Sequence, residues 1–310
     1  MRDWIREVGR VLGCAEVATG HFRLDVLAPG TAARVRPGQF AMVRVGPGPD
    51  TVGGGPFLAR PLSFFDIDPS RGVISFLVRV VGQGTRALAS CRPGDGLLLT
   101  GPYGNGFPPV SEGALLLVAG GVGVAPFPPV ARAAASAGVP VRAVVGARTA
   151  GLLLGVRELQ EAGAEVITCT EDGSQGVRGT VTDALPAVLR QPRAGPPTVG
   201  PAGRAGAVAP GEGTRVTVFA CGPPAMLAAV DRLLARERAG WGTGQVTGQG
   251  SAEEVWPFYV SLEARMGCGF GVCRGCAVPA RGGGYLHVCQ EGPVFPAVAV
   301  DLEGVARIGV

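Results

Sequence analysis

Four cysteines near the carboxyl end of the chain constrain its fold more strongly than any other feature. Their spacing, C-x4-C-x2-C followed by a distant cysteine, is typical of a plant-type [2Fe-2S] cluster, in which each iron takes two thiolates. Glycines lie between these cysteines, where a loop wrapped around an inorganic core needs positive φ angles and free backbone N–H groups. The predicted cluster ligands are Cys268, Cys273, Cys276 and Cys289.

Two other interpretations of these cysteines stay open. Structural zinc sites usually carry two C-x2-C knuckles, whereas only Cys273 and Cys276 form one here. A disulfide would need an oxidising compartment. We expect a cytoplasmic protein instead, because the first residues mix charges where a signal peptide would be apolar. Iron–sulfur binding is therefore the favoured interpretation, with zinc as its main alternative.

The composition indicates a folded globular protein of about two domains and an appendage. The chain has 310 residues, of which 46% are hydrophobic and 17% are charged. Its net charge of +4 is small and dispersed, so we expect no nucleic-acid partner. Glycines and prolines interrupt the uncharged segment 113–131, so we expect no membrane span. The two histidines lie near no nucleophile signature, so a hydrolytic triad is not expected.

The first hundred residues alternate short β-rich runs with Pro/Gly turns, which is typical of an antiparallel β-barrel. The predicted strands are 21–27, 40–45, 73–81 and 97–100.

Two motifs in this half predict a phosphate-binding site. Arg60 and Ser63 place a cation and a hydroxyl three residues apart, on a backbone that proline restricts. Gly84 and Thr85 follow a predicted strand, where glycine lets the backbone approach a pyrophosphate and Thr85 is predicted to be a helix N-cap. For the first motif alone, an edge strand with a solvated arginine is an equal alternative.

From residue 114 the pattern changes to buried strands alternating with helices, which predicts a doubly wound parallel sheet. The predicted strands are 114–119, 141–145, 165–170 and 216–221, and the predicted helices include 152–162, 182–190 and 226–238.

Two Gly/Pro turns follow strands of this sheet. Because the carboxyl ends of parallel strands meet at one edge, we expect both turns to face one crevice and to bind a nicotinamide dinucleotide. The alternative is a pair of tight turns without a ligand. The residues are Gly120, Gly121, Gly123 and Pro126 in the first turn and Cys221, Gly222 and Pro223 in the second.

The chain is predicted to have three domains: a barrel over 1–110, an α/β domain over 111–250 and a cluster domain over 251–310. Segments 46–55, 191–213 and 240–251 are rich in small, turn-forming residues, and we expect them to be flexible surface insertions.

Together these motifs resemble the iron–sulfur electron-transfer subunit of type-B dihydroorotate dehydrogenase, in the ferredoxin-reductase superfamily. They span nearly the whole chain in family order, and the tail Glu263-x-Arg-Met-x-Cys leads into the cysteine loop. The resemblance implies FAD on the barrel, NAD on the second domain and [2Fe-2S] in the tail. It carries FAD binding to Arg60, Pro61, Leu62, Ser63, Leu77, Val78, Arg79, Gly84 and Thr85.

The resemblance also implies a partner, an FMN-containing catalytic subunit that oxidises dihydroorotate to orotate in pyrimidine (UMP) biosynthesis. Two copies of each subunit would form a heterotetramer, and electrons would pass through the cluster and FAD to NAD. No catalytic residue is expected in this chain, because hydride exchange between NADH and FAD needs no protein acid or base. The tail is expected at the subunit interface, with Phe270 and Val272 as apolar contacts or, equally, as local packing.

Two departures from the family pattern limit this comparison. Tyr103 stands where an aliphatic residue is common, and Arg148 follows a strand where it could meet the 2′-phosphate of NADP. The alternatives are a related subunit of a ferredoxin:NADP oxidoreductase, sulfur reductase or hydrogenase, and a cofactor-free, zinc-stabilised binding module. The visible absorption spectrum separates a flavin and iron–sulfur protein from a colourless zinc protein.

Overall fold

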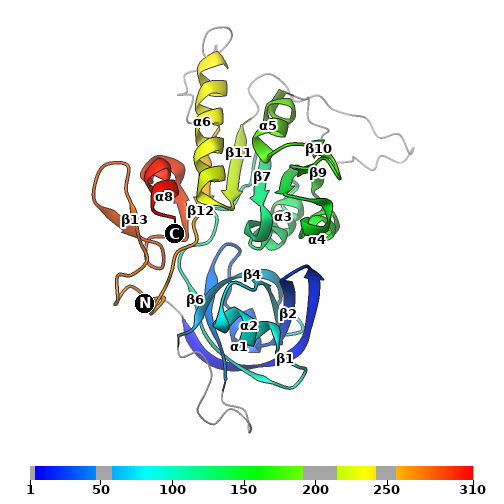
Figure 1. Ribbon diagram of the computed structural model, residues 1–310, viewed down its shortest axis with the longest axis vertical. Helices are drawn as coiled ribbons and strands as arrows, with labels where there is room; N and C mark the ends of the chain where they lie inside the picture. The colour runs from blue at the N-terminus through cyan, green and yellow to red at the C-terminus, as the bar shows by residue number, and fades with distance from the viewer. Residues whose placement is uncertain (1–3, 47–57, 191–214, 242–255, 310) are drawn as a thin grey trace, which may run out of the picture.

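The computed structural model describes residues 4–46, 58–190, 215–241 and 256–309. Within them the chain forms a closed barrel, a seven-stranded sheet with helices on both faces, and a small two-stranded sheet in the tail (Figure 1). Nearly all of the predicted insertions 46–55, 191–213 and 240–251 lie outside the described residues. So does the predicted boundary at residue 250, and the division into three domains stays a prediction.

The barrel confirms the predicted antiparallel β architecture. Its strands close in the order β1-β2-β5-β4-β3-β6, and two short helices accompany them. Large apolar side chains such as Leu24, Ile74 and Phe76 fill the inside. The elements are β1 (Ile5–Ala18), β2 (His21–Leu27), α1 (Pro29–Ala32), β3 (Phe40–Val45), β4 (Arg60–Asp68), β5 (Val73–Arg79), α2 (Gln83–Ala89) and β6 (Gly96–Tyr103).

Strands β1 and β4 are absent from the predicted strands. The exposed positions of β1 are mostly charged or small, so its sequence lacks a continuous β-rich run. Strand β4 is bonded to β3 on one side and to β5 on the other, so it is an interior strand of the barrel. The pairing of β4 with β5 begins at Phe64, whereas Arg60 to Ser63 pair with β3. The edge-strand alternative for Arg60 therefore stays open at this end of β4.

The second sheet has the order β10-β9-β8-β7-β11-β12-β15, with only β15 antiparallel to its neighbour. Its strands are β7 (Ala114–Gly120), β8 (Val141–Ala147), β9 (Glu165–Thr170), β10 (Val177–Arg178), β11 (Val216–Cys221), β12 (Phe258–Ser261) and β15 (Val294–Pro296). The parallel sheet predicted from residue 114 is thus confirmed, and the tail extends it by two strands.

Helices cover both faces of this sheet. Leu115 and Leu117 of β7 pack with α3 and α4, whereas Leu116 and Val118 pack with α5, α6 and α8. This alternation is what a strand buried on both faces requires. The helices are α3 (Phe127–Ser136), α4 (Val156–Glu161), α5 (Val181–Arg190), α6 (Pro224–Trp241) and α8 (Leu302–Ile308), with 3-10 turns η1 (Gly121–Val124), η2 (Ala150–Leu152) and η3 (Ala297–Ala299).

The helix predicted over 152–162 is shorter than expected. Gly155 has a left-handed conformation with φ +67°, which ends the preceding turn and makes α4 begin at Val156. Among the described helices, none has the length and apolar composition that crossing a membrane requires.

The tail after β12 packs against the sheet. Its small sheet pairs β13 (Ala277–Pro279) with β14 (Tyr285–His287). Val278 and Val288 share a buried cluster with Val218 of β11. The cysteine loop is therefore attached to the α/β domain through a common core.

Candidate functional site

The predicted flavin segments meet at one end of the barrel. Arg60 begins β4 and Arg79 ends β5, and these neighbouring antiparallel strands place the two positions at the same end. The guanidinium of Arg60 lies against Gly84 in the first turn of α2, where a Cβ would overlap it. Arg60 thus lies over a glycine in the first turn of a helix, which fits the close backbone approach that a dinucleotide phosphate needs.

The position of Thr85 differs from the prediction. The N-cap of α2 is Gly82, and Thr85 is the third residue inside the helix. Its hydroxyl accepts hydrogen bonds from the backbone N–H groups of Val81 (2.9 Å) and Gly82 (3.2 Å). The prediction of an N-cap was therefore wrong. Thr85 occupies the third helical position, and its side chain accepts a hydrogen bond from the backbone N–H of the N-cap residue, as the third residue of a capping box does.

The two predicted nicotinamide turns pack directly against each other. β7 and β11 are neighbours, with Ala119 opposite Cys221. A Cβ at Gly123 would overlap the carbonyl of Cys221, and one at Gly120 would lie 2.6 Å from Sδ of Met226. The expectation that both turns share one edge of the sheet is confirmed, while nucleotide binding there stays a prediction.

The four predicted cluster ligands form two pairs. The sulfurs of Cys276 and Cys289 lie 3.2 Å apart, and the backbone N–H of Cys273 donates to Sγ of Cys268 (3.4 Å). Gly269 and Gly271 have φ angles of +82° and +94°, the positive values expected for this loop. Two pairs of thiols match a cluster in which each iron takes two thiolates, so the donor set fits [2Fe-2S].

Backbone N–H groups favour the thiolate form at one of these positions. Burial raises the pKa of Cys268, but hydrogen bonds from the backbone of Cys273, Phe270 and Val272 outweigh it and lower the pKa to about 7. Burial and the contact with Cys276 raise the pKa of Cys289 to about 12. Across the described residues, no three His, Cys, Asp or Glu side chains converge as a single metal ion would require.

Aromatic side chains hold the cysteine loop on the barrel. Phe270 stacks on Trp4 at a centroid distance of 6.3 Å, and Tyr103 lies 6.0 Å from Trp4 and 6.2 Å from Phe270. A Cβ at Gly269 would overlap Met42 of β3. Tyr103 is only 4% exposed, so the aromatic residue that departs from the family pattern is part of this contact. Trp4 was missed, because no local pattern links it to a loop so distant in sequence.

Glu263 begins the tail motif, but no role was assigned to it from the sequence. It follows β12 and lies within electrostatic range of Arg79 and Cys221, one from each predicted dinucleotide site. The side chain keeps exposed area, yet dense surrounding protein raises the pKa of its carboxyl and Arg79 lowers it in part. The sequence did offer a signal for this residue. It is acidic and lies just after β12, which pairs with β11, the strand that precedes a predicted nucleotide-binding turn.

Arg148 lies just after β8, where the sequence placed it. Its side chain is exposed and forms no ion pair with any residue in the described ranges. Its carbonyl accepts a hydrogen bond from the backbone N–H of Asp172 (3.2 Å), which follows β9. The backbones of a cationic and an acidic residue therefore meet at this edge of the sheet.

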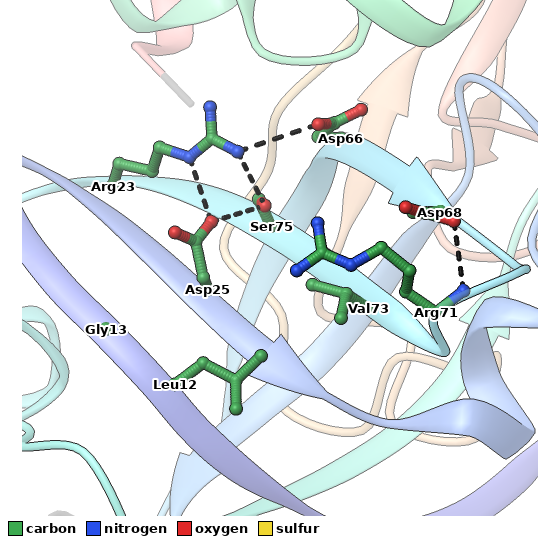
Figure 2. A pocket seen from close by; sticks show the side chains of 9 residues that line it. All are labelled: Leu12, Gly13, Arg23, Asp25, Asp66, Asp68, Arg71, Val73 and Ser75. Carbon is green, nitrogen blue, oxygen red and sulfur yellow. Dashed lines mark hydrogen bonds and ion pairs between the residues drawn. The ribbon is translucent and has the colours of Figure 1, made fainter.

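A separate pocket lies on the outer wall of the barrel (Figure 2). Its volume is about 230 Å³, and none of the predicted cofactor residues lines it. Its lining is strongly charged and consists of Leu12, Gly13, Arg23, Asp25, Asp66, Asp68, Arg71, Val73 and Ser75.

Comparison with known families identifies relatives over nearly the whole chain. Residues 263–301 match the family described as the iron-sulfur cluster binding domain of dihydroorotate dehydrogenase B. Two similar proteins are the electron transfer subunits of dihydroorotate dehydrogenase B (NAD(+)) from Desulforamulus reducens and Geobacillus thermodenitrificans. The first is 32% identical, covering 95% of this chain and 97% of the relative. The second is 34% identical, covering 96% and 99%.

Solved structures show the same fold. The NADH-dependent reduced ferredoxin-NADP oxidoreductase structure is 28% identical with a TM-score of 0.74, covering 97% of this chain and 92% of that one. The cytochrome P450 reductase GcoB of Amycolatopsis is 23% identical with a TM-score of 0.57, covering 77% and 68%. The second similarity concerns the fold alone.

Proposed function

This chain belongs to the family of dihydroorotate dehydrogenase B electron transfer subunits, and from this we propose that it carries electrons from a partner subunit to NAD. The partner is an FMN-containing subunit that oxidises dihydroorotate, the step that leads to UMP. The single observation that carries this proposal is the paired arrangement of Cys268 with Cys273 and of Cys276 with Cys289, in a loop packed between the barrel and the sheet.

The proposed cofactor sites follow from the geometry of the chain. Arg60 would pair with an FAD phosphate beside the first turn of α2, and residues 77–79 would lie along the flavin. The turns at 120–126 and 221–223 would hold NAD, and the four cysteines would hold the cluster. FAD supplies the conversion between hydride exchange with NAD and single-electron exchange with the cluster.

The surface around the cysteine loop supports docking of the partner there. Phe270 and Val272 are 46% and 75% exposed, and Trp4 is 48% exposed beside them. Arg265 and Arg274 are also exposed and form no ion pair with a described residue. An apolar centre with a cationic rim suits a partner surface with an acidic rim. We infer a heterotetramer with two copies of each subunit, located in the cytoplasm.

The coenzyme is proposed to be NAD, as in the names of the relatives. Arg148 favours one competing possibility, since an exposed guanidinium at this strand end suits the 2′-phosphate of NADP. The ratio of kcat/KM for NADH and NADPH in dye reduction separates the two. A strong NADPH preference that Arg148→Ala abolishes would identify an NADP enzyme of a related type.

Reconstitution with the partner tests the proposed function. The chain purified alone should contain flavin and iron, reduce artificial dyes with NADH and show no oxidation of dihydroorotate. Co-expression with an FMN subunit should yield a stable complex that reduces NAD with dihydroorotate. A colourless zinc protein, dihydroorotate turnover by the single chain, or failure to bind the FMN subunit would each contradict the proposal.

A further inference from the structure

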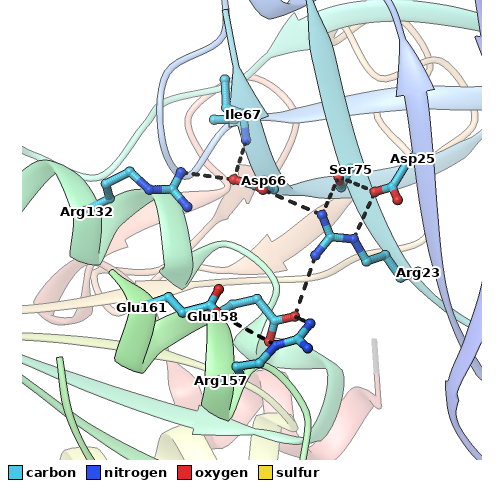
Figure 3. Close-up of polar contacts among 9 residues, drawn as sticks. All are labelled: Arg23, Asp25, Asp66, Ile67, Ser75, Arg132, Arg157, Glu158 and Glu161. Atoms are coloured by element: carbon cyan, nitrogen blue, oxygen red, sulfur yellow. Dashed lines mark hydrogen bonds and ion pairs between the residues drawn. The ribbon is translucent and has the colours of Figure 1, made fainter. Parts of the chain in front are cut away.

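Ion pairs connect the barrel to two helices of the α/β domain (Figure 3). Arg23 of β2 reaches Glu158 of α4, with Nη1 and Oε1 3.5 Å apart. Asp66 of β4 accepts a hydrogen bond from Nη1 of Arg132 in α3 at 2.9 Å. The two connections are joined within the barrel, because Nη2 of Arg23 lies 3.6 Å from Oδ2 of Asp66. We propose that Arg23 and Asp66 are positioning residues that orient the α/β domain on the barrel for hydride exchange.

A buried aromatic side chain gives the same junction a third point of attachment. Phe65 precedes Asp66 on β4, is 1% exposed, and belongs to the apolar cluster that α3 and α4 form with the sheet. The guanidinium of Arg23 lies 5.5 Å from its ring centroid. Leu77 of β5 belongs to the same cluster, and apolar contacts of this kind have little directionality. Ion pairs to two different helices add direction, because each one ties a separate helix to the barrel.

The junction is built on the elements that carry both predicted dinucleotide sites. Asp66 follows the Arg60 motif on β4, and Arg23 stands opposite Leu77 in the pairing of β2 with β5. On the other side, α3 begins directly after the glycine turn at residues 120–126. A shift of these ion pairs therefore moves the predicted NAD turn relative to the predicted flavin strands. Hydride transfer is sensitive to such shifts, since a misplacement of about 1 Å can cost about 100-fold in rate.

The ion pairs of this junction are partly shielded from solvent, but dissolved ions can still approach them. The side chains of Arg23, Asp66 and Glu158 keep 25%, 30% and 18% of their surface. Desolvation alone would lower the pKa of Arg23, but Asp25, Asp66 and Glu158 outweigh it and raise the pKa, so the guanidinium stays charged. The pocket of Figure 2 opens onto Arg23, Asp25 and Asp66, which gives ions access to one side. The orientation of the domains should thus depend on ionic strength.

The helix α4 offers a matched control for testing this proposal. Glu158 and Glu161 lie one turn apart and both pair with Arg157 of the same helix (3.3 and 3.6 Å). Among the described residues, Glu161 forms no ion pair with the barrel. The junction variants are Glu158→Gln, Arg132→Gln and their combination, and the control is Glu161→Gln. Each is prepared as the holoprotein, and flavin reduction by NADH is followed anaerobically by stopped flow over a range of salt concentrations.

We expect the double variant to reduce its flavin about tenfold more slowly than the unaltered chain, with FAD and iron content retained. The rate of flavin reduction in the double variant should depend much less on salt than in the unaltered chain. A general loss of stability would not remove this salt dependence. Small-angle scattering should show a broader distribution of domain orientations. Glu161→Gln should match the unaltered chain in all three measurements. If the double variant folds poorly, the single variant Glu158→Gln is compared with Glu161→Gln instead, and we expect the same changes at a smaller size.

Two results would overturn the proposal: an unchanged rate and salt dependence in the folded junction variants, or an equal loss in Glu161→Gln. The proposal rests on the proposed function only for its rate measurement. Absence of FAD or of NADH reduction in the unaltered chain would contradict the function, whereas the scattering comparison would still test whether these ion pairs orient the domains.

Discussion

The barrel is joined to its two neighbours by contacts of opposite character. Toward the α/β domain it presents charged side chains beside the buried Phe65 and Leu77, with Arg23 reaching α4 and Asp66 reaching α3. Toward the cysteine loop it presents Met42, Tyr103 and Trp4, and backbone bonds such as Asn105 N–H to the carbonyl of Gly292 (2.6 Å). The first contact should therefore be sensitive to salt, whereas the second should depend on close packing.

This difference fits the roles that we propose for the two neighbours. A resident cluster must keep a constant distance from its electron donor and acceptor, and apolar packing allows little displacement. Hydride exchange with a coenzyme that binds and leaves at every turnover needs one relative orientation of the two domains, which ion pairs to two helices can restore. Ion pairs at the surface supply modest and adjustable stabilisation, in the range of about 0.2–1 kcal/mol for each exposed pair.

The largest expected effect comes from breaking the packed contact. Gly269→Val should abolish cluster binding, because Gly269 has a φ of +82° and a side chain there would overlap Met42. Iron content and visible absorbance measure the loss, while NADH-dependent dye reduction through FAD should persist. Gly282→Val is the control, since nothing lies within 4 Å of a Cβ at that glycine of the same tail. Equal iron retention in both variants would contradict the prediction.

Truncating the exposed aromatic partner should weaken the same contact without destroying it. Trp4→Ala removes the stack on Phe270, and an aromatic pair contributes about 0.5–1.5 kcal/mol beyond its buried area. We expect the cluster to be lost several times faster to an iron chelator, as followed by absorbance. Tyr285→Ala removes an aromatic side chain that is 72% exposed elsewhere in the tail, and it should behave like the unaltered chain.

Salt should affect the two contacts of the barrel differently in the unaltered protein. Raising ionic strength from about 0.01 M to 1 M shortens the screening length from about 30 Å to about 3 Å. Flavin reduction by NADH should therefore slow a few-fold, whereas the rate of cluster loss to a chelator should hardly change. Parallel changes in both rates would show that the contacts do not differ as described.

The smallest effect concerns Glu263, which follows β12. Dense surrounding protein raises the pKa of its carboxyl in the folded chain above the unfolded value, although the side chain keeps exposed area and Arg79 offsets part of the shift. Between these pKa values the folded state binds more protons than the unfolded state, so stability falls as pH rises through that window and stays reduced above it. Glu263→Gln should raise the thermal midpoint slightly at neutral pH and leave it unchanged in acid. An equal shift at both pH values would refute this account.

Local sequence patterns were sufficient to predict features that depend on residues close together in the sequence. The glycines of the cysteine loop predicted positive φ angles, which are observed at Gly269 and Gly271 but not at Gly267 and Gly275. Short β-rich and continuous apolar runs predicted most strands of both sheets. These predictions of backbone conformation held where conformation is a property of a short segment.

Predictions failed where a residue has two acceptable local roles. Thr85 suits an N-cap and also an inner capping position, and the neighbouring glycine took the cap. The long strand β1 alternates buried and charged positions too irregularly to be recognised, and it forms because the barrel closes around it. In both cases the surrounding structure selected between local alternatives of similar energy.

The sequence by itself predicted the chemistry that we propose for this protein: four thiol ligands, the glycine turns for dinucleotides and the arginine beside a hydroxyl. Only the tertiary structure decided that Trp4 stacks on Phe270, that Arg60 lies over Gly84, and which carboxylates meet Arg23. The reason is physical. A ligand motif specifies its own geometry over a few residues. A charged or aromatic side chain can interact with many different partners, and the folded backbone decides which of them lies close enough.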